Sequence, residues 1–166
     1  MKIIFPLISL LFLVVTAFAQ QLASLPAVQL QTITGESVST NEITNDGSPI
    51  LIIVWATWCH HATDGMTSIN DEFLDDWIEK YNLKVVGISV DDARNTVKVG
   101  PIVNGNGWDF EHFMDPNGDF KRAMGVNAPP HLFIINGKRE VVWSFNSFNP
   151  GDETEIEKIL ESIKTE

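Results

Sequence analysis

Residues 50–62 read ILIIVWATWCHHA, an apolar run that passes directly into a polar segment. The six apolar residues 50–55 have the length and composition of a strand that is covered on both faces. Cys59 follows this strand, where the free amide groups and the dipole of a following helix favour the thiolate form of a cysteine. The stretch therefore predicts a central strand, a helix that begins near Cys59, and a reactive sulfur between them.

Cys59 is the only cysteine among the 166 residues. In a Cys-x-x-Cys pair the second sulfur releases a mixed disulfide, but Ala62 stands at that position in this chain. A protein with one cysteine has no internal disulfide, so its stability must come from its hydrophobic core. The sequence therefore restricts any redox chemistry to a single thiol.

The N-terminal segment predicts export. Residues 1–19 carry one charge, Lys2, ahead of an apolar run over 3–15, and they end Ala-Phe-Ala. This pattern is typical of a cleaved signal peptide, and the run is shorter than the roughly 20 residues that a membrane span needs. We therefore expect residues 20–166 to form one exported domain without stable membrane insertion. It would be periplasmic in a Gram-negative bacterium and secreted otherwise.

The charge balance argues against polyanionic partners. Without Lys2 the chain has ten Lys and Arg against 22 Asp and Glu, which is a formal charge of −12. Nucleic acid and anionic membranes would be repelled by such a domain. The acidic residues are dense over 71–79 and 153–161, a pattern typical of solvated helix faces.

The rest of the chain alternates strand and helix patterns. Apolar residues at 62, 66, 69, 73 and 77 recur at helical spacing after Cys59. We expect an edge hairpin around Thr34-Gly35 and a tight hairpin at Asn136-Gly137. Further helices are predicted from 91–92 to about 100–101 or shortly after, over 120–124, and from Asp152 onward. The remaining strands are predicted at 83–90, 110–114, 132–135 and 141–145.

This order of elements resembles the thioredoxin fold, and more narrowly the exported TlpA/ResA-type redoxins, which are thiol-disulfide oxidoreductases. Three motifs carry the resemblance: WATWC at 55–59, DPNG at 115–118 and GVNAPPHLFIINGK at 125–138. It covers the chain from about Pro26 to the end. It implies a three-layer α/β fold, with a central mixed sheet flanked by helices and an inserted β-α unit. It also implies a cis Pro130 beside the sulfur, and it requires no cofactor.

The chain departs from this family at four places. Ala62 replaces the resolving cysteine, and Ile53 stands where thioredoxins carry a buried acid that manages the proton of that cysteine. Pro129 lacks the backbone amide that the residue before the cis proline usually offers to an extended peptide. His60 and His61 fill the dipeptide whose residues tune the thiolate, and they favour it further when they are protonated.

The first function that we consider is monothiol redox chemistry. Cys59 would attack a disulfide, a peroxide or a glutathione mixed disulfide, and an external thiol reductant would complete the cycle. Trp58 would tune access to the sulfur. The opposing interpretation is a relative that has lost catalysis and keeps Cys59 as a small core residue. Asp91 or Asp92 falls near the place of an acidic active-site residue in ResA-type proteins, although helix capping explains either residue equally well.

The second function is metal binding. Cys59, His131 and either His60 or His61 carry the thiolate and imidazole donors that suit copper or zinc. Adjacent residues on a helix point about 100° apart, so His60 and His61 would not serve one ion together. The opposing interpretation is that the histidines are solvated or structural.

The third function is partner binding without catalysis. Trp55, Trp58 and Pro130 would form the surface that holds a partner protein. The opposing interpretation is that Trp55 belongs to the core and that Trp58 partly covers the thiol.

Overall fold

The computed structural model describes residues 23–149 and 151–164. A seven-stranded mixed sheet lies at its centre, in the order β2-β1-β5-β4-β3-β6-β7. The pairs β3–β4 and β4–β5 are parallel, and the other neighbours are antiparallel. The strands are β1 (Gln29–Thr32), β2 (Ser37–Ser39), β3 (Ile50–Trp55), β4 (Lys84–Ser89), β5 (Glu111–Met114), β6 (His131–Ile135) and β7 (Val141–Phe145).

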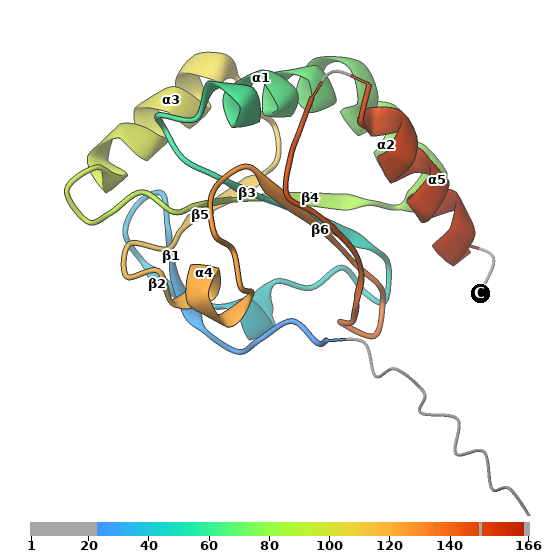
Figure 1. Ribbon diagram of the computed structural model, residues 1–166, viewed down its shortest axis with the longest axis horizontal. Coiled ribbons are helices and arrows are strands. Elements are labelled where there is room, and N and C mark those ends of the chain that lie inside the picture. Colours follow the sequence, from blue (N-terminus) through green and yellow to red (C-terminus); the bar gives the residue numbers. More distant parts are fainter. Residues whose placement is uncertain (1–22, 150, 165–166) are drawn as a thin grey trace, which may run out of the picture.

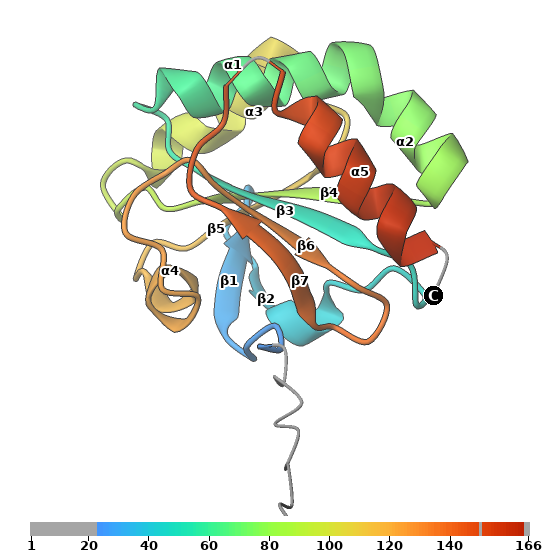
Figure 2. The same ribbon diagram turned by 45° about the vertical axis from the view of Figure 1, so that its right-hand side comes forward.

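Helices cover both faces of this sheet. Figures 1 and 2 show α1, α2, α3 and α5 on one face and α4 on the other. The helices are α1 (His60–Ser68), α2 (Leu74–Tyr81), α3 (Val99–Asn106), α4 (Asp119–Ala123) and α5 (Glu153–Lys164), with short segments η1 (Thr40–Glu42), η2 (Ile69–Phe73) and η3 (Thr96–Lys98). This is the expected arrangement of three layers around a mixed sheet.

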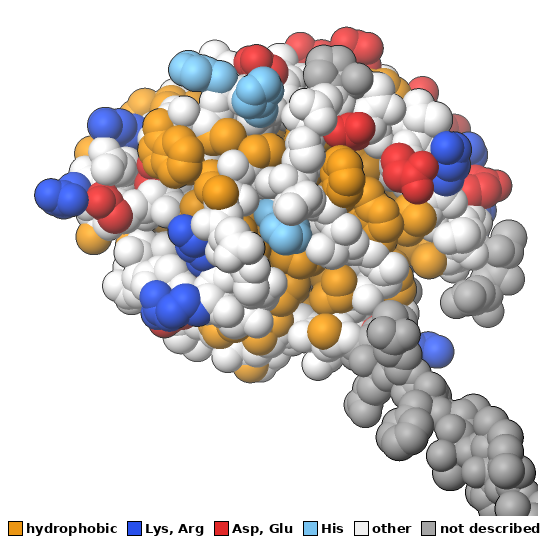
Figure 3. Space-filling view, in the orientation of Figure 1, with side chains coloured by type: hydrophobic (Ala, Val, Ile, Leu, Met, Phe, Trp, Pro, Cys, Tyr) orange, Lys and Arg blue, Asp and Glu red, His pale blue; other side chains and the backbone are white. Residues whose placement is uncertain are grey.

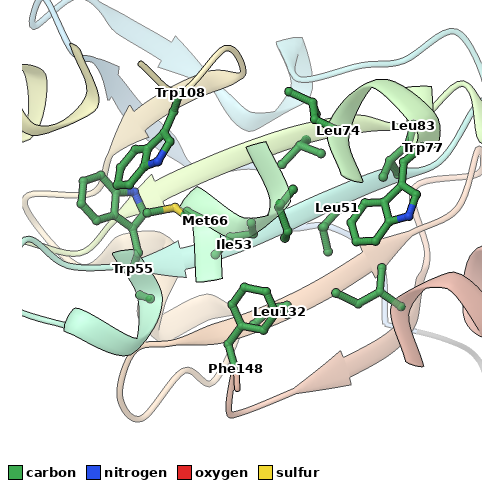
Figure 4. Packing of buried hydrophobic residues seen from close by; sticks show 14 of the residues in the cluster. Leu51, Ile53, Trp55, Met66, Leu74, Trp77, Leu83, Trp108, Leu132 and Phe148 are labelled. Atoms are coloured by element: carbon green, nitrogen blue, oxygen red, sulfur yellow. The ribbon is translucent and has the colours of Figure 1, made fainter. Parts of the chain in front are cut away.

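The two faces of β3 build two separate cores, because successive side chains of a strand point to opposite sides. Leu51, Ile53 and Trp55 pack into the cluster beneath α1, α2, α3 and α5, part of which Figure 4 shows. Ile52 and Val54 pack into the cluster on the α4 side. All six residues of β3 are buried, as the unbroken apolar run predicts.

The helix that follows Cys59 is continuous but irregular. Between α1 and α2 the chain forms one π-helical turn, η2, which inserts an extra residue into the helical repeat. The buried place that the spacing gives to Phe73 consequently falls to Leu74, whereas Trp77 stays buried as predicted. Leu74 is buried in the core, whereas Phe73, which the spacing places on the stripe, is only partly buried and packs against Trp77 at 5.3 Å between ring centroids.

The helix predicted from residues 91–92 to about 100–101 or shortly after is present, but it begins and ends later than expected, with η3 leading into α3. The Asp92 carboxylate accepts hydrogen bonds from the amides of Arg94 and Asn95, which makes a turn, and α3 begins only at Val99. Pro101 therefore lies in the first turn of the helix and not at its end. Proline is tolerated in the first turn because the amide there has no partner within the helix.

Two other boundaries differ from expectation. The connection between β6 and β7 spans residues 136–140, which is longer than a two-residue turn, and Arg139 adopts φ +65° within it. The Asn136 side chain organises this loop, since its oxygen accepts hydrogen bonds from the amides of Lys138 and Glu140. The last helix begins at Glu153, one residue after the predicted start.

None of the helices within residues 23–149 and 151–164 combines the length and the apolar character needed to cross a bilayer. The predicted signal peptide, residues 1–19, lies outside the described residues.

Candidate active site

Cys59 lies at the junction of β3 and α1, as the N-cap residue of that helix. Its carbonyl oxygen accepts hydrogen bonds from the amides of Ala62 and Thr63, both at 3.1 Å. Its side chain makes no capping hydrogen bond and is only 8% exposed. The sulfur is thus nearly buried at the positive end of a nine-residue helix, where an anionic sulfur is stabilised by the helix dipole.

The turn before Cys59 is held by a buried carboxylate. Asp91 is 1% exposed, and its Oδ2 accepts the amide of Thr57 at 2.8 Å while its Oδ1 accepts the Thr57 hydroxyl at 2.7 Å. The Ser89 hydroxyl donates to Oδ2 as well, at 2.8 Å. Three short hydrogen bonds to one carboxylate therefore clamp the turn to the end of β4.

The sequence left Asp91 and Asp92 equivalent, and the structure separates them. Asp92 is exposed and serves the local turn, and hydrogen bonding from Arg94 lowers the pKa of its carboxyl group. Asp91 instead reaches across to Thr57, 34 residues away in the chain. One signal was available in the sequence: Asp91 follows a buried strand, and the carboxyl ends of adjacent parallel strands lie at one edge of a sheet.

The Pro129-Pro130 peptide bond is cis, as the resemblance implies. Residue 131 pairs with Val54 in the antiparallel register of β6 and β3, so Pro130 lies at the carboxyl end of β3, where the Cys59 turn begins. Pro129 brings no backbone amide to this edge. Both prolines are partly exposed.

His131 does not join Cys59. Its ring stacks on Phe133 with centroids 4.4 Å apart, and its Nε2 lies 3.0 Å from the Ser144 hydroxyl. Phe133 belongs to the core on the α4 side, whereas Cys59 belongs to the core on the α1 side. Partial burial lowers the pKa of His131. Among the residues that the structure describes, no three His, Cys, Asp or Glu side chains are grouped so that they could hold a metal ion.

The aromatic and histidine neighbours of Cys59 divide between surface and core. Trp58 is 63% exposed, and His60 and His61 are exposed on the first turn of α1. Trp55 is fully buried and meets Trp108 edge to face, with centroids 5.4 Å apart. The expectation that Trp55 contributes to a binding surface is therefore wrong, because its side chain packs into the core beneath the helices on the α1 side of the sheet.

A buried histidine lies behind this site. His112 on β5 packs against Trp55, Trp108 and Phe110, with ring centroids 4.6–5.9 Å away. Neither of its ring nitrogens has a hydrogen-bond partner among residues 23–149 and 151–164, and burial lowers its pKa to about 4. A side chain at Gly87 on β4 would collide with its ring, so the histidine occupies space that this glycine leaves open. The ring is neutral at pH 7.

Solved structures of known proteins share this fold. A thioredoxin-like protein from Porphyromonas gingivalis matches with a TM-score of 0.74 and 38% sequence identity, over 87% of this chain and 94% of that one. A secreted disulfide oxidoreductase from Mycobacterium tuberculosis matches with a TM-score of 0.64 and 15% identity, over 82% and 96% of the two chains. At 15% identity the likeness concerns the fold alone. The predicted thioredoxin-like α/β fold is confirmed.

Sequence relatives point the same way. The thiol:disulfide interchange protein DsbE of Haemophilus influenzae is 28% identical over 113 residues, which are 68% of this chain and 59% of that protein. This chain thus spans less than two thirds of the length of that relative. A model of the AhpC/TSA family matches residues 23–144, well over half of the chain. With the strand, the Cys59 turn and the cis proline all inside the matched region, the chain belongs to the AhpC/TSA family of thioredoxin-like redoxins.

Proposed function

We propose that this protein is an exported monothiol oxidoreductase in which Cys59 performs thiol-disulfide exchange. The observation that carries the proposal is the position of Cys59: a single, nearly buried thiol at the start of α1, in a turn clamped by Asp91. Both features suit a reactive thiol, because the helix end favours an anionic sulfur and the clamp fixes the turn that carries it. DsbE, whose name describes thiol:disulfide interchange, is among the sequence relatives and supports the same chemistry.

The reaction has two balanced steps. The Cys59 thiolate attacks one sulfur of a substrate disulfide, which forms a Cys59–substrate disulfide and expels the other sulfur as a thiolate. An external thiol, in its thiolate form, then attacks the mixed disulfide, forms a new disulfide with the substrate and restores the Cys59 thiolate. The external thiol is required because Ala62 stands where a resolving cysteine would act.

The remaining side chains have supporting roles in this proposal. Trp58 is exposed beside the sulfur and gives a substrate an apolar surface to contact. His60 and His61 lie on the open face of the helix start and add positive charge when they are protonated. Pro130 lies at the carboxyl end of β3, where the Cys59 turn begins. Pro129 lacks the backbone amide through which an extended peptide could dock.

The test is the rate at which the purified protein reduces a glutathione mixed disulfide, with Cys59→Ser as the control. We expect turnover that depends on Cys59 and on an added thiol. Absence of turnover in the wild-type protein would contradict the proposal and favour the second candidate, a non-catalytic module that holds a partner through the exposed Trp58. In that case Trp58→Ala, and not Cys59→Ser, would abolish partner binding.

A gain-of-function variant tests whether the Cys59 turn and the surrounding fold can support dithiol chemistry. Ala62 is fully buried one turn after Cys59, so Ala62→Cys would place a second sulfur near the first. We expect the reduced, dithiol form of this variant to reduce one protein disulfide per molecule without an added monothiol, and its two thiols to end as an internal disulfide. Ala62→Ser is the size-matched control. If Ala62→Cys stays inactive toward proteins, the double variant with Pro129→Thr shows whether the missing amide is responsible.

Export is part of the same proposal. It rests on the apolar N-terminal run and the Ala-Phe-Ala ending at residue 19. Mass spectrometry of the protein recovered from its native host would identify the mature N-terminus, which we expect at Gln20. An N-terminus at Met1 would contradict cleavage.

A further inference from the structure

One titratable side chain in the core of the domain has no part in the proposed reaction. His112 is 7% exposed, and neither ring nitrogen has a hydrogen-bond partner in the part of the chain that the structure describes. The rings of Trp55, Trp108 and Phe110 lie around it, and its own ring fills the space beside Gly87. An apolar ring would match these surroundings without burying two polar nitrogens. The property that the imidazole adds is its ability to take a proton.

Within the described residues, no charged group compensates a proton on His112. The ionisable side chains of the elements around this cluster are exposed or paired with one another, and they are Lys84, Asp109, Glu111, and His60, His61 and Asp64 of α1. Figure 3 shows histidine and acidic side chains at the outer surface of the helical layer. A charge on the buried imidazole would therefore stay uncompensated among apolar rings, which is why burial lowers the pKa of His112 to about 4.

The rings around this histidine also support α1, the helix that begins after Cys59. The indole N–H of Trp108 donates a hydrogen bond to the Thr67 hydroxyl of α1 at 3.1 Å. Figure 4 shows the Met66 side chain of α1 reaching toward the Trp55 and Trp108 rings, and all three belong to one core cluster. Both indoles therefore contact the imidazole as well as α1.

A charged imidazole would break this packing. A cation without a partner is far more stable in water than among apolar rings, so protonated His112 is expected to leave the cluster. Its departure removes the support beneath α1, whose N-cap residue is Cys59. The Cys59 side chain is only 8% exposed, so its sulfur has little contact with solvent until α1 moves.

We propose that protonation of His112 is an acid switch that loosens α1 and exposes the Cys59 sulfur. The inference concerns the regulation of the proposed thiol chemistry and rests on that function for its consequence, which is that acid raises the access of disulfides to the thiol. The neutral imidazole stabilises the closed form above pH 6.5. The closed form weakens as the pH falls toward 4, because the proton binds the open form more tightly.

The test follows the reaction of Cys59 with the small disulfide dithiodipyridine between pH 7 and pH 4, in the wild-type protein and in His112→Phe. The Cys59 sulfur forms a disulfide with one half of the probe, and the other half leaves as thiopyridone, whose absorbance gives the rate. Cys59→Ser sets the background. The ratio of the wild-type rate to the His112→Phe rate cancels the pH dependence of the thiol and of the probe.

We expect this ratio to rise by between about tenfold and about a hundredfold from pH 7 to pH 4. His112→Leu, which is also unable to titrate, gives the same comparison with a differently shaped side chain. A ratio that stays within about twofold against both variants would overturn the switch.

Two control variants test whether the response belongs to His112. Burial also lowers the pKa of His131, but its ring stacks on Phe133 in the core on the α4 side, so His131→Phe should keep the acid response. The double variant His60→Gln/His61→Gln should keep it too, because both histidines are exposed. Loss of the response in either control would overturn the assignment to His112.

Hydrogen exchange at pH 4, measured by mass spectrometry, locates the opening. We expect faster exchange over α1 and residues 108–112 in the wild-type protein than in His112→Phe, with little difference on the α4 side of the sheet. An equal acceleration throughout the domain would show global unfolding and would overturn a local switch. The probe measures exposure of the sulfur and not turnover, so a working switch without reduction of a glutathione mixed disulfide would overturn only the proposed oxidoreductase function.

Discussion

Removal of the Asp91 carboxylate should both destabilise the domain and release the turn that holds Cys59. Asp91 is 1% exposed and accepts three hydrogen bonds, two from Thr57 and one from Ser89, at 2.7–2.8 Å. A net hydrogen bond to a charged group contributes about 1.5–3 kcal/mol, and a buried donor without a partner costs about 1–3 kcal/mol. The wild-type protein spends free energy to remove the Asp91 carboxylate from water on folding. The alanine variant does not, and this offsets part of the loss.

We therefore expect Asp91→Ala to lower the free energy of unfolding by about 3–4 kcal/mol. Thr57→Val removes only the hydroxyl donor and should cost about 1–2 kcal/mol. In the Asp91→Ala background the same Thr57→Val change should cost almost nothing, because its acceptor is already gone. Asp92→Asn is the matched control on the exposed neighbour, and we expect it to change stability by less than about 1 kcal/mol.

Urea denaturation of the four single and double variants measures these values, with the slope checked for constancy. Alkylation of Cys59 in the folded protein provides the second readout. Because the sulfur is only 8% exposed when the turn is clamped, its alkylation should accelerate in Asp91→Ala and Thr57→Val but not in Asp92→Asn. Additive destabilisation by Asp91→Ala and Thr57→Val, or unchanged alkylation in both, would refute the clamp.

Two further predictions concern the core. Because burial lowers the pKa of His112 from 6.5 to about 4, its neutral form stabilises the folded state above pH 6.5, and this stability is lost as the pH falls toward 4. We expect the titration of this residue to lower the free energy of unfolding by about 3 kcal/mol between pH 7 and pH 4, as measured by urea denaturation. A His112→Phe variant that kept the full pH dependence would contradict this. At Gly65 an added Cβ would overlap the buried Phe148 ring, so Gly65→Ala should destabilise by about 1–3 kcal/mol. Gly105→Ala, on α3 with open space around it, should be neutral or slightly stabilising in the same thermal melts, and the reverse ranking would be inconsistent with the packing.

Positions that depend on chain neighbours alone follow from the sequence. The unbroken apolar run at 50–55 has to be a strand buried on both faces, and it is. The helical spacing after Cys59 predicts both the long helix and the buried position of the sulfur. The motif around Pro130 predicts the cis bond through its resemblance to known redoxins. Periodicity and motifs are local properties of the chain, so they can be interpreted without knowledge of the tertiary contacts.

Positions that depend on alignment between distant segments were decided by the tertiary structure. Asp91 and Asp92 are adjacent and chemically identical, and only the parallel register of β3 and β4 turns the first toward Thr57. The alternation of β6 sends His131 to the face opposite Cys59, which no spacing in the sequence reveals. A single π-helical turn moves Leu74 into the core in place of Phe73. In each case the sequence supplies the side chain, whereas its direction depends on strand register, helix geometry and packing.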